Sequence, residues 1–174
     1  MSATPAGTER EAAIWEALAG IPDPEIPAIG LVDLGVIGDV VAEDDGSVRV
    51  QLLPTFVGCP AIGVMQERIV ERLTERRLAD AVTVELRFDP PWTSDRITER
   101  GRDRLRASGF APPAPPQAGR DLVGLEELAV MPVAECPYCG SRNTTIDNPF
   151  GPTLCRAIYH CDDCRQPFEQ FKRV

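Results

Sequence analysis

Two pairs of cysteines near the end of the chain carry the strongest chemical signal in the sequence. They are Cys136-Pro-Tyr-Cys139 and Cys161-Asp-Asp-Cys164, with 21 residues between the pairs. A Cys-x-x-Cys turn points two thiolates at one ion, and two such turns complete a tetrahedron with Zn–S distances of about 2.3 Å. Four thiolates fill the coordination shell, so we expect a structural zinc site, with iron as the alternative metal. Redox dithiols or disulfides are the remaining interpretation, because the spacing lies just beyond the usual zinc range.

Cys155 lies six residues before Cys161 and belongs to neither pair. It is a buried small residue, a ligand of an alternative or larger cluster, or a reactive surface thiol. His160 is the only histidine of the chain, and we expect it to be a strand or surface residue beside the second pair. A single histidine also argues against a Cys–His catalytic pair.

Cys59 is the one cysteine of the first two thirds of the chain, and it stands between Gly58 and Pro60. Pro60 fits the first position of a helix, which places Cys59 at or beside the N-cap. The free amide groups at a helix start stabilise a thiolate there. A buried, inert cysteine is the alternative interpretation.

Asp23 and Glu25 lie in a loop that contains prolines 22, 24 and 27. A loop stiffened in this way holds two carboxylates at fixed positions, which suits the binding of a metal or a partner. The alternative is that these acids are solvated and cap the segment that follows them.

The balance of charge excludes one class of function. Among 174 residues, 18 Lys and Arg stand against 27 Asp and Glu, so the net charge is −9. Binding of a phosphate backbone needs a basic face, and we therefore expect no nucleic-acid partner. No apolar run approaches the roughly 20 residues of a membrane span, and no signal-peptide pattern is present. We expect a cytoplasmic protein without a membrane partner, in which the cysteines are thiols or metal ligands.

A proline-rich segment over residues 111–120 predicts a linker between two domains. The first domain is predicted over residues 1–110 and the second over residues 121–174. The second is too short for a large apolar core, and a bound metal would supply the missing stability.

The pattern of apolar residues predicts an α+β fold. In the first domain we expect strands over 34–42 and 48–53, and a helix over 61–78 with one apolar face formed by Ile62, Met65, Ile69 and Leu73. A further strand is expected in which residues 82, 84, 86 and 88 form the buried face. The helix makes the last strand parallel to one strand of the hairpin. A final helix is expected to begin at Ser94 or Asp95 and to end at Gly109. Short β-like segments around the cysteine pairs predict a zinc ribbon; they cover residues 128–134, 143–146, 157–160 and 167–171.

Three motifs of the first domain resemble the small domain of the SufT-like iron–sulfur assembly factors. They are Asp23-Pro-Glu25, Asp33-Leu-Gly35 and Leu53-Pro-Thr55-Phe-Val-Gly-Cys59-Pro60, the last of which departs from the family pattern at Leu53.

A longer resemblance covers nearly the whole chain and points to the PaaD family, the accessory proteins of the bacterial phenylacetyl-CoA ring-epoxidising complex. The motifs that carry it are Pro90-Pro-Trp-Thr-Ser-Asp95, Gly109-Phe-Ala-Pro-Pro113, Cys136-Pro-Tyr-Cys-Gly-Ser141 and Phe150-Gly-Pro-Thr-Leu-Cys155-Arg-Ala-Ile-Tyr-His-Cys161. Pro152 is a small departure, because the family often has Ser or Ala there.

The resemblance implies an iron–sulfur assembly domain followed by a four-cysteine zinc ribbon. The implied role is the maturation or delivery of a metal cofactor, either the iron–sulfur cluster of the reductase component or the di-iron centre of the oxygenase. Cys59 would be the functional thiol, in transient contact with iron or a cluster, and the candidate metal or partner contacts are Asp23, Glu25, Thr55 and Cys155. No catalytic residue is expected, because the chain has neither a GxGxxG fingerprint nor paired Glu-x-x-His motifs. A thiol enzyme that depends on Cys59 and a purely structural adaptor are the alternatives.

Overall fold

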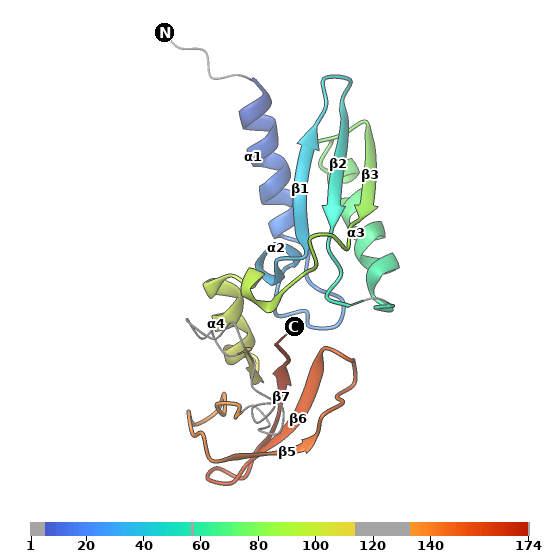
Figure 1. The fold of residues 1–174 in the computed structure, drawn as a ribbon. Coiled ribbons are helices and arrows are strands. Elements are labelled where there is room, and N and C mark those ends of the chain that lie inside the picture. Colours follow the sequence, from blue (N-terminus) through green and yellow to red (C-terminus); the bar gives the residue numbers. More distant parts are fainter. Residues whose placement is uncertain (1–5, 57, 114–132, 174) are drawn as a thin grey trace. The chain divides into compact units, whose positions relative to one another are not determined.

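The computed structural model describes residues 6–56, 58–113 and 133–173, which divide into two compact units, Met1–Gly101 and Arg102–Val174 (Figure 1). The first unit contains helices and strands, and the second is mostly β-structure, so the α+β fold class is confirmed. Most of the linker predicted over 111–120, and most of the strand predicted over 128–134, lie outside the described residues. The boundaries of the two domains therefore stay a prediction.

The first unit contains a three-stranded sheet in the order β1-β2-β3. Its elements are α1 (Ala6–Ala19), α2 (Leu31–Leu34), β1 (Ile37–Ala42), β2 (Ser47–Leu52), α3 (Ile62–Glu75), β3 (Ala81–Leu86) and the 3₁₀ helix η1 (Ser94–Arg96). β1 and β2 form the expected antiparallel hairpin, and β3 runs parallel to β2. The parallel pairing confirms the prediction, because α3 supplies the crossover that such a connection needs.

One face of this sheet is apolar and carries the helices. Val48 and Val50 of β2 are buried, whereas Arg49 between them is exposed. α1 contacts β1 and α3, and α3 contacts β3. Of the four residues predicted on the apolar face of α3, Met65, Ile69 and Leu73 are buried, whereas Ile62 at the start of the helix is half-buried. The face of β3 predicted to be buried is only partly covered: Val82 and Val84 are half-buried, whereas Leu86 is 38% and Phe88 49% exposed. β3 lies at the edge of the sheet and ends at Leu86, before Phe88.

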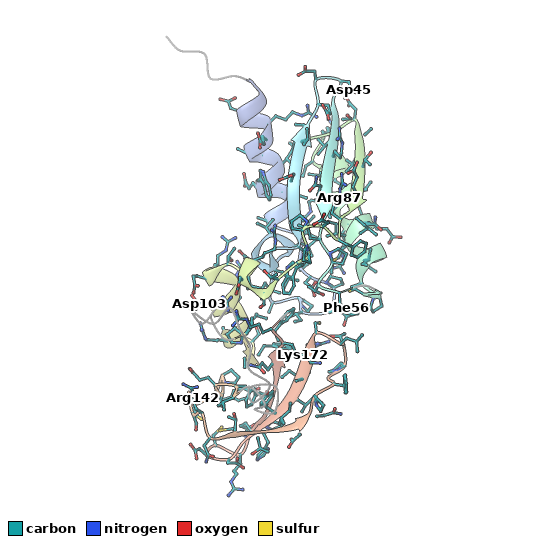
Figure 2. All side chains as sticks on the ribbon, in the orientation of Figure 1. Asp45, Phe56, Arg87, Asp103, Arg142 and Lys172 are labelled. Atoms are coloured by element: carbon teal, nitrogen blue, oxygen red, sulfur yellow. The ribbon has the colours of Figure 1, made fainter. Side chains whose placement is uncertain are left out.

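Three loops leave the sheet at the same end. Leu52, the last residue of β2, pairs with Ile37 at the start of β1 and with Leu86 at the end of β3. Figure 2 labels Asp45 in the turn of the hairpin and Phe56 near the opposite end of this unit. The loops that precede β1, follow β2 and follow β3 therefore meet at one end of the sheet. Of the three motifs of the iron–sulfur assembly pattern, the first lies in the connection from α1 to α2, the second covers the end of α2, and the third begins directly after β2.

The helix α4 (Glu99–Ala107) begins later than the sequence predicted. Neither Ser94 nor Asp95 starts it, and the hydroxyl of Thr98 accepts a hydrogen bond from the N–H of Gly101 at 3.0 Å. Thr98 is thus the residue whose side chain caps the helix. Among the described residues, none of the helices has the length and the hydropathy needed to cross a membrane.

The second unit contains a four-stranded sheet in the order β4-β7-β6-β5. The strands are β4 (Phe110–Ala111), β5 (Thr144–Asn148), β6 (Arg156–Cys161) and β7 (Pro167–Phe171). β5 to β7 are antiparallel neighbours, as expected for a ribbon, and the short β4 pairs in parallel with β7.

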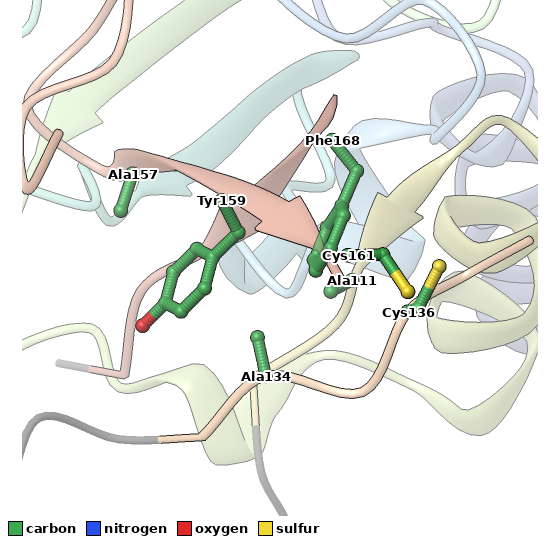
Figure 3. Packing of buried hydrophobic residues seen from close by; sticks show 7 residues of the cluster. All are labelled: Ala111, Ala134, Cys136, Ala157, Tyr159, Cys161 and Phe168. Atoms are coloured by element: carbon green, nitrogen blue, oxygen red, sulfur yellow. The ribbon is translucent and has the colours of Figure 1, made fainter. Parts of the chain in front are cut away.

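The core of this unit is small (Figure 3). The rings of Tyr159 and Phe168 stack with their centroids 5.7 Å apart, and two cysteines, Cys136 and Cys161, are buried beside alanines. Among the described residues of this unit, few large apolar side chains join the cluster, so this cluster contributes little hydrophobic stabilisation. A metal cross-link between the cysteine pairs would supply the missing free energy.

Candidate metal centre

Each cysteine pair forms a tight turn that the main chain closes. In the first turn the N–H of Gly140 donates to the carbonyl of Cys136 at 2.9 Å, and the N–H of Cys136 donates to the carbonyl of Ser141 at 2.8 Å. The second turn repeats both bonds. The N–H of Arg165 donates to the carbonyl of Cys161 at 2.9 Å, and the N–H of Cys161 donates to the carbonyl of Gln166 at 3.0 Å. The sulfurs of each pair are therefore held by backbone rather than by flexible side-chain contacts.

The two turns bring their four sulfurs together. The Sγ atoms of Cys136, Cys139, Cys161 and Cys164 all lie within 4.8 Å of one another. Two of the separations, Cys136–Cys164 and Cys139–Cys161, are 3.6 Å. A tetrahedron with Zn–S bonds of about 2.3 Å has sulfur–sulfur edges of roughly 3.8 Å, so the donor set fits zinc. Figure 3 shows the sulfurs of Cys136 and Cys161 side by side.

The four thiols differ in how easily they ionise. The N–H groups of Cys164 and Asp163 approach the sulfur of Cys161 and lower the pKa of its thiol to about 7. Burial raises the pKa of Cys164 to about 12, and the neighbouring thiols act in the same direction. Four negative sulfurs at this separation repel one another strongly. A bound cation is what allows all of them to be thiolates at neutral pH.

Asp163 ties the two cysteine turns together. Its carboxylate accepts hydrogen bonds from the hydroxyl of Ser141 and from Nδ2 of Asn143, and the hydroxyl of Ser141 lowers its pKa. Behind it, the N–H of Asp162 donates to the carbonyl of Asn143 at 3.0 Å. Such outer contacts orient metal ligands. This cross-link was not predicted from the sequence, where its only local signal is the pair of acids between Cys161 and Cys164.

Cys155 lies outside the group of four sulfurs. It is half-buried at the end of the connection from β5 to β6, with its Sγ 3.1 Å from the hydroxyl of Thr153. Its carbonyl accepts the N–H of Lys172 at 2.8 Å. In the described part of the chain, the four paired cysteines are the one group of three or more His, Cys, Asp or Glu side chains near enough to share a metal.

Asp23 shapes the loop that carries it. The side chain is 3% exposed, and its Oδ1 accepts the N–H of Glu25 at 2.9 Å and that of Ile26 at 2.7 Å. A carboxylate that caps its own loop fixes the path of the following residues. Glu25 is exposed on the same turn. Asp23 therefore positions the loop, and Glu25 is the carboxylate at its surface.

Cys59 lies in the loop between β2 and α3, and it is half-buried. The expected position at or beside the N-cap needs correction, because α3 begins at Ile62 and its N-cap is Ala61. Cys59 stands two residues earlier, where its carbonyl accepts the N–H of Ile62 at 3.3 Å in a turn that leads into the helix. Gly58 allows that turn with a φ of 85°. Thr55 is buried in the same loop.

Asp33 is a buried carboxylate whose contacts were not predicted from the sequence. It is 2% exposed and accepts the hydroxyl of Thr98 at 2.9 Å and the guanidinium of Arg100 at 3.0 Å. These bonds tie α2 to the start of α4. The sequence contains one sign of these contacts, an acidic residue within an apolar segment. A charged side chain that such a segment buries needs a polar partner.

The fold and the cysteine centre together define a protein that combines an iron–sulfur assembly domain with a four-cysteine zinc ribbon. Residues 11–86 match the family "Iron-sulfur cluster assembly protein", and residues 123–172 match the "PaaD zinc beta ribbon domain". A protein of Escherichia coli K12, provisionally named as one of the subunits of 1,2-phenylacetyl-CoA epoxidase, is 40% identical over 161 residues, which are 92% of each chain. The chain belongs to the PaaD family.

Two further relatives match the first unit. The Fe–S protein maturation auxiliary factor YitW of Bacillus subtilis is 28% identical over 53% of this chain and 89% of its own length. The crystal structure of a DUF59 domain from Bacillus anthracis covers 57% of this chain and 94% of its own, with a TM-score of 0.54 and 24% identity. This structure shares the fold of the first unit.

Proposed function

We propose that the protein supports a phenylacetyl-CoA epoxidase system by maturing or delivering one of its metal cofactors. The observation that carries the proposal is the presence, in one chain, of an assembly domain and a ribbon, together with the similarity over most of its length to a relative named as an epoxidase subunit. The names of the relatives that match the first unit alone, maturation auxiliary factors, support a role in iron–sulfur chemistry. The reductase cluster and the di-iron centre of the oxygenase are the two recipients to be compared.

Cys59 is the proposed contact for the cargo. A thiolate is a soft ligand that binds iron or an iron–sulfur cluster. It releases the cargo by exchange for the ligands of a recipient, which are cysteines for a cluster and carboxylates and histidines for di-iron, without a change of oxidation state. Cys59 follows Gly58, whose positive φ turns the loop after β2. This loop lies at the end of the sheet where the loop of Asp23 and Glu25 also lies. Glu25 and Thr55 are proposed secondary contacts on this end, and Cys155 is a proposed contact of the second unit.

The ribbon is proposed to hold one zinc ion through Cys136, Cys139, Cys161 and Cys164. The ion would add to the small apolar core of the second unit, and all four ligand positions would be taken by protein. The ribbon therefore acts as a folded docking module and contributes no open metal site for catalysis.

The test is growth on phenylacetate of a strain that lacks its own copy of the protein and carries a variant. Cys59→Ala should abolish growth while circular dichroism and the melting temperature stay native, because the substitution removes one half-buried sulfur. Cys155→Ala removes the other cysteine that lies outside the group of four, and as a proposed secondary contact it should lower growth less than Cys59→Ala does. Full growth with Cys59→Ala at native expression would overturn the thiol role and favour a structural adaptor.

A second measurement separates delivery from thiol enzymology. Protein purified without oxygen should transfer a loaded iron–sulfur cluster to the apo-reductase, or loaded iron to the apo-oxygenase, and Cys59→Ala should transfer neither. Turnover of a thioester that iodoacetamide abolishes, in the absence of transfer, would instead favour the Cys59-dependent enzyme.

A further inference from the structure

β3 is an edge strand that no other described strand covers. It is the last strand in the order β1-β2-β3, and the N–H of Arg87, one residue beyond it, donates to the carbonyl of Leu52 in β2. Backbone groups of successive strand residues point in alternate directions, so the odd-numbered residues of β3 face β2. The even-numbered residues direct their N–H and C=O groups to the open edge, and these are Val82, Val84 and Leu86.

A side chain of α3 confirms this direction. Nε2 of Gln66 donates to the carbonyl of Val84 at 3.3 Å, which is long for a hydrogen bond. Among the described residues, it is the one hydrogen bond between a side chain and this edge. Between the helix and the strand runs a shallow groove with Val70 and Val84 on its floor. Val70 is 39% exposed and Leu86 is 38% exposed. The edge therefore offers both unpaired backbone groups and apolar surface.

The wall of the groove is acidic. Glu67, Glu71 and Glu75 line it from α3. They follow one another at intervals of four residues, so they share one side of the helix, and like charges at this spacing repel. Within residues 6–56, 58–113 and 133–173, none of the three makes a hydrogen bond or an ion pair. The chemistry that would complement this wall is a row of positive charges.

A second copy of the chain does not fit this surface. Antiparallel pairing of β3 with the β3 of another copy would place both α3 helices on the same face of the joined sheet. The two rows of glutamates would then face each other across the joint, in a protein that already has a net charge of −9. Electrostatic repulsion opposes that arrangement, whereas it favours a basic partner.

We propose that the open edge of β3 binds an extended, basic segment of a partner protein as a fourth strand of the sheet. The main chain of the segment would pair with Val82, Val84 and Leu86. Alternate side chains would lie over α3, where the methylene stems of Arg or Lys cover Val70 and their charged ends reach the glutamates. Gln66 would give up its bond to Val84 when the strand is added.

The probe is a seven-residue peptide of alternating Arg and Val, acetylated and amidated, added to the full-length zinc-loaded protein. Hydrogen exchange of the amides of Val82, Val84 and Leu86 should slow by about tenfold or more at saturation. The amides of Thr83 and Glu85 already pair with β2, and their exchange should not change.

Two triple variants test the charge. Glu67→Gln, Glu71→Gln and Glu75→Gln together should weaken peptide binding by about tenfold, because three exposed charge contacts are lost. The matched control removes the same charge from α1 through Glu9→Gln, Glu11→Gln and Glu16→Gln, and it should bind the peptide as the native protein does.

Four results would overturn the proposal. They are unchanged exchange at the three edge amides, equal affinity for a peptide with Glu in place of Arg, equal affinity for a peptide N-methylated at alternate residues, and protection of the edge amides by self-association of the protein alone. The third result would show adsorption to an acidic surface without strand pairing, and the fourth would show that a second copy is the occupant.

Discussion

Gly140 and Arg165 occupy equivalent positions in the two cysteine turns. Each directly follows the second cysteine of its pair and donates its N–H to the carbonyl of the first cysteine at 2.9 Å. Each also has a positive φ, 73° for Gly140 and 63° for Arg165. Glycine adopts this conformation without steric cost, whereas a side chain does not. The second turn therefore contains a strained residue that the first avoids.

The first prediction follows from this strain. Arg165→Gly should stabilise the ribbon by about 0.5–1 kcal/mol, since relief of an αL residue is worth about 1–2 kcal/mol and the added chain entropy of glycine removes part of that gain. A thermal melt of the zinc-loaded protein and the rate of zinc loss to a chelator measure the effect. Arg142→Gly, at an exposed position without a positive φ, is the control and should not stabilise. A lower melting temperature for Arg165→Gly would contradict the prediction.

The second prediction concerns the metal. We expect one zinc ion per chain, and Cys136→Ser should unfold mainly the second unit, because structural zinc binding is part of the folding free energy. The first unit has its own apolar core and should keep its helical circular dichroism. Metal analysis and exchange of the β6 amides report the two effects. Negligible metal in correctly folded protein purified without oxygen would refute this assignment.

The third prediction is the pH dependence of zinc affinity. Zinc displaces protons from the thiols, so the affinity should fall as the pH falls. The Cys161 thiol, with a pKa of about 7, is largely ionised above pH 7 and protonated below it. Binding then releases one more proton below pH 7 than above it, and the slope of log affinity against pH should steepen by about one. Competition with a chromophoric chelator between pH 6 and 8 measures the slope, and a constant affinity would exclude four thiolate ligands.

The fourth prediction concerns the reactivity of the cysteines. In the zinc-loaded protein, alkylation at neutral pH should label Cys59 before Cys155. Both are half-buried, but Cys59 stands between two exposed residues, Gly58 and Pro60, whereas Cys155 directly precedes the buried Arg156. Peptide mapping by mass spectrometry after short exposure to iodoacetamide gives the order. Faster labelling of Cys155, with Cys59 protected in the folded protein, would mean that Cys59 is a packing residue.

The fifth prediction addresses the buried carboxylate. Asp33→Ala should lower the free energy of unfolding of the first unit by about 2 kcal/mol, because it removes the bonds to Thr98 and Arg100 and leaves a small cavity. Asp39→Ala, on an exposed position of β1, is the control and should change stability by less than about 0.5 kcal/mol. Urea unfolding monitored by Trp92, buried in the same unit, compares the two variants.

Features that depend on near neighbours along the chain could be predicted from the residues alone. The period of the apolar residues predicted α3 and its buried face, and the helix between two strands predicted the parallel pairing of β2 and β3. The spacing of the four paired cysteines predicted their convergence, because a Cys-x-x-Cys turn is short enough to be set by its own residues. Motifs that extend over both units also indicated the family.

The tertiary structure decided which acidic side chains are buried and which residues they bind. Asp33 bonds Arg100 across 67 residues, and Asp163 bonds Ser141 across 22, so no local pattern contains either contact. The position of Cys59 relative to α3, the strain at Arg165 and the open edge of β3 likewise depend on where loops end and which strands become neighbours. Those outcomes are set by packing among distant segments, which side-chain periodicity does not encode.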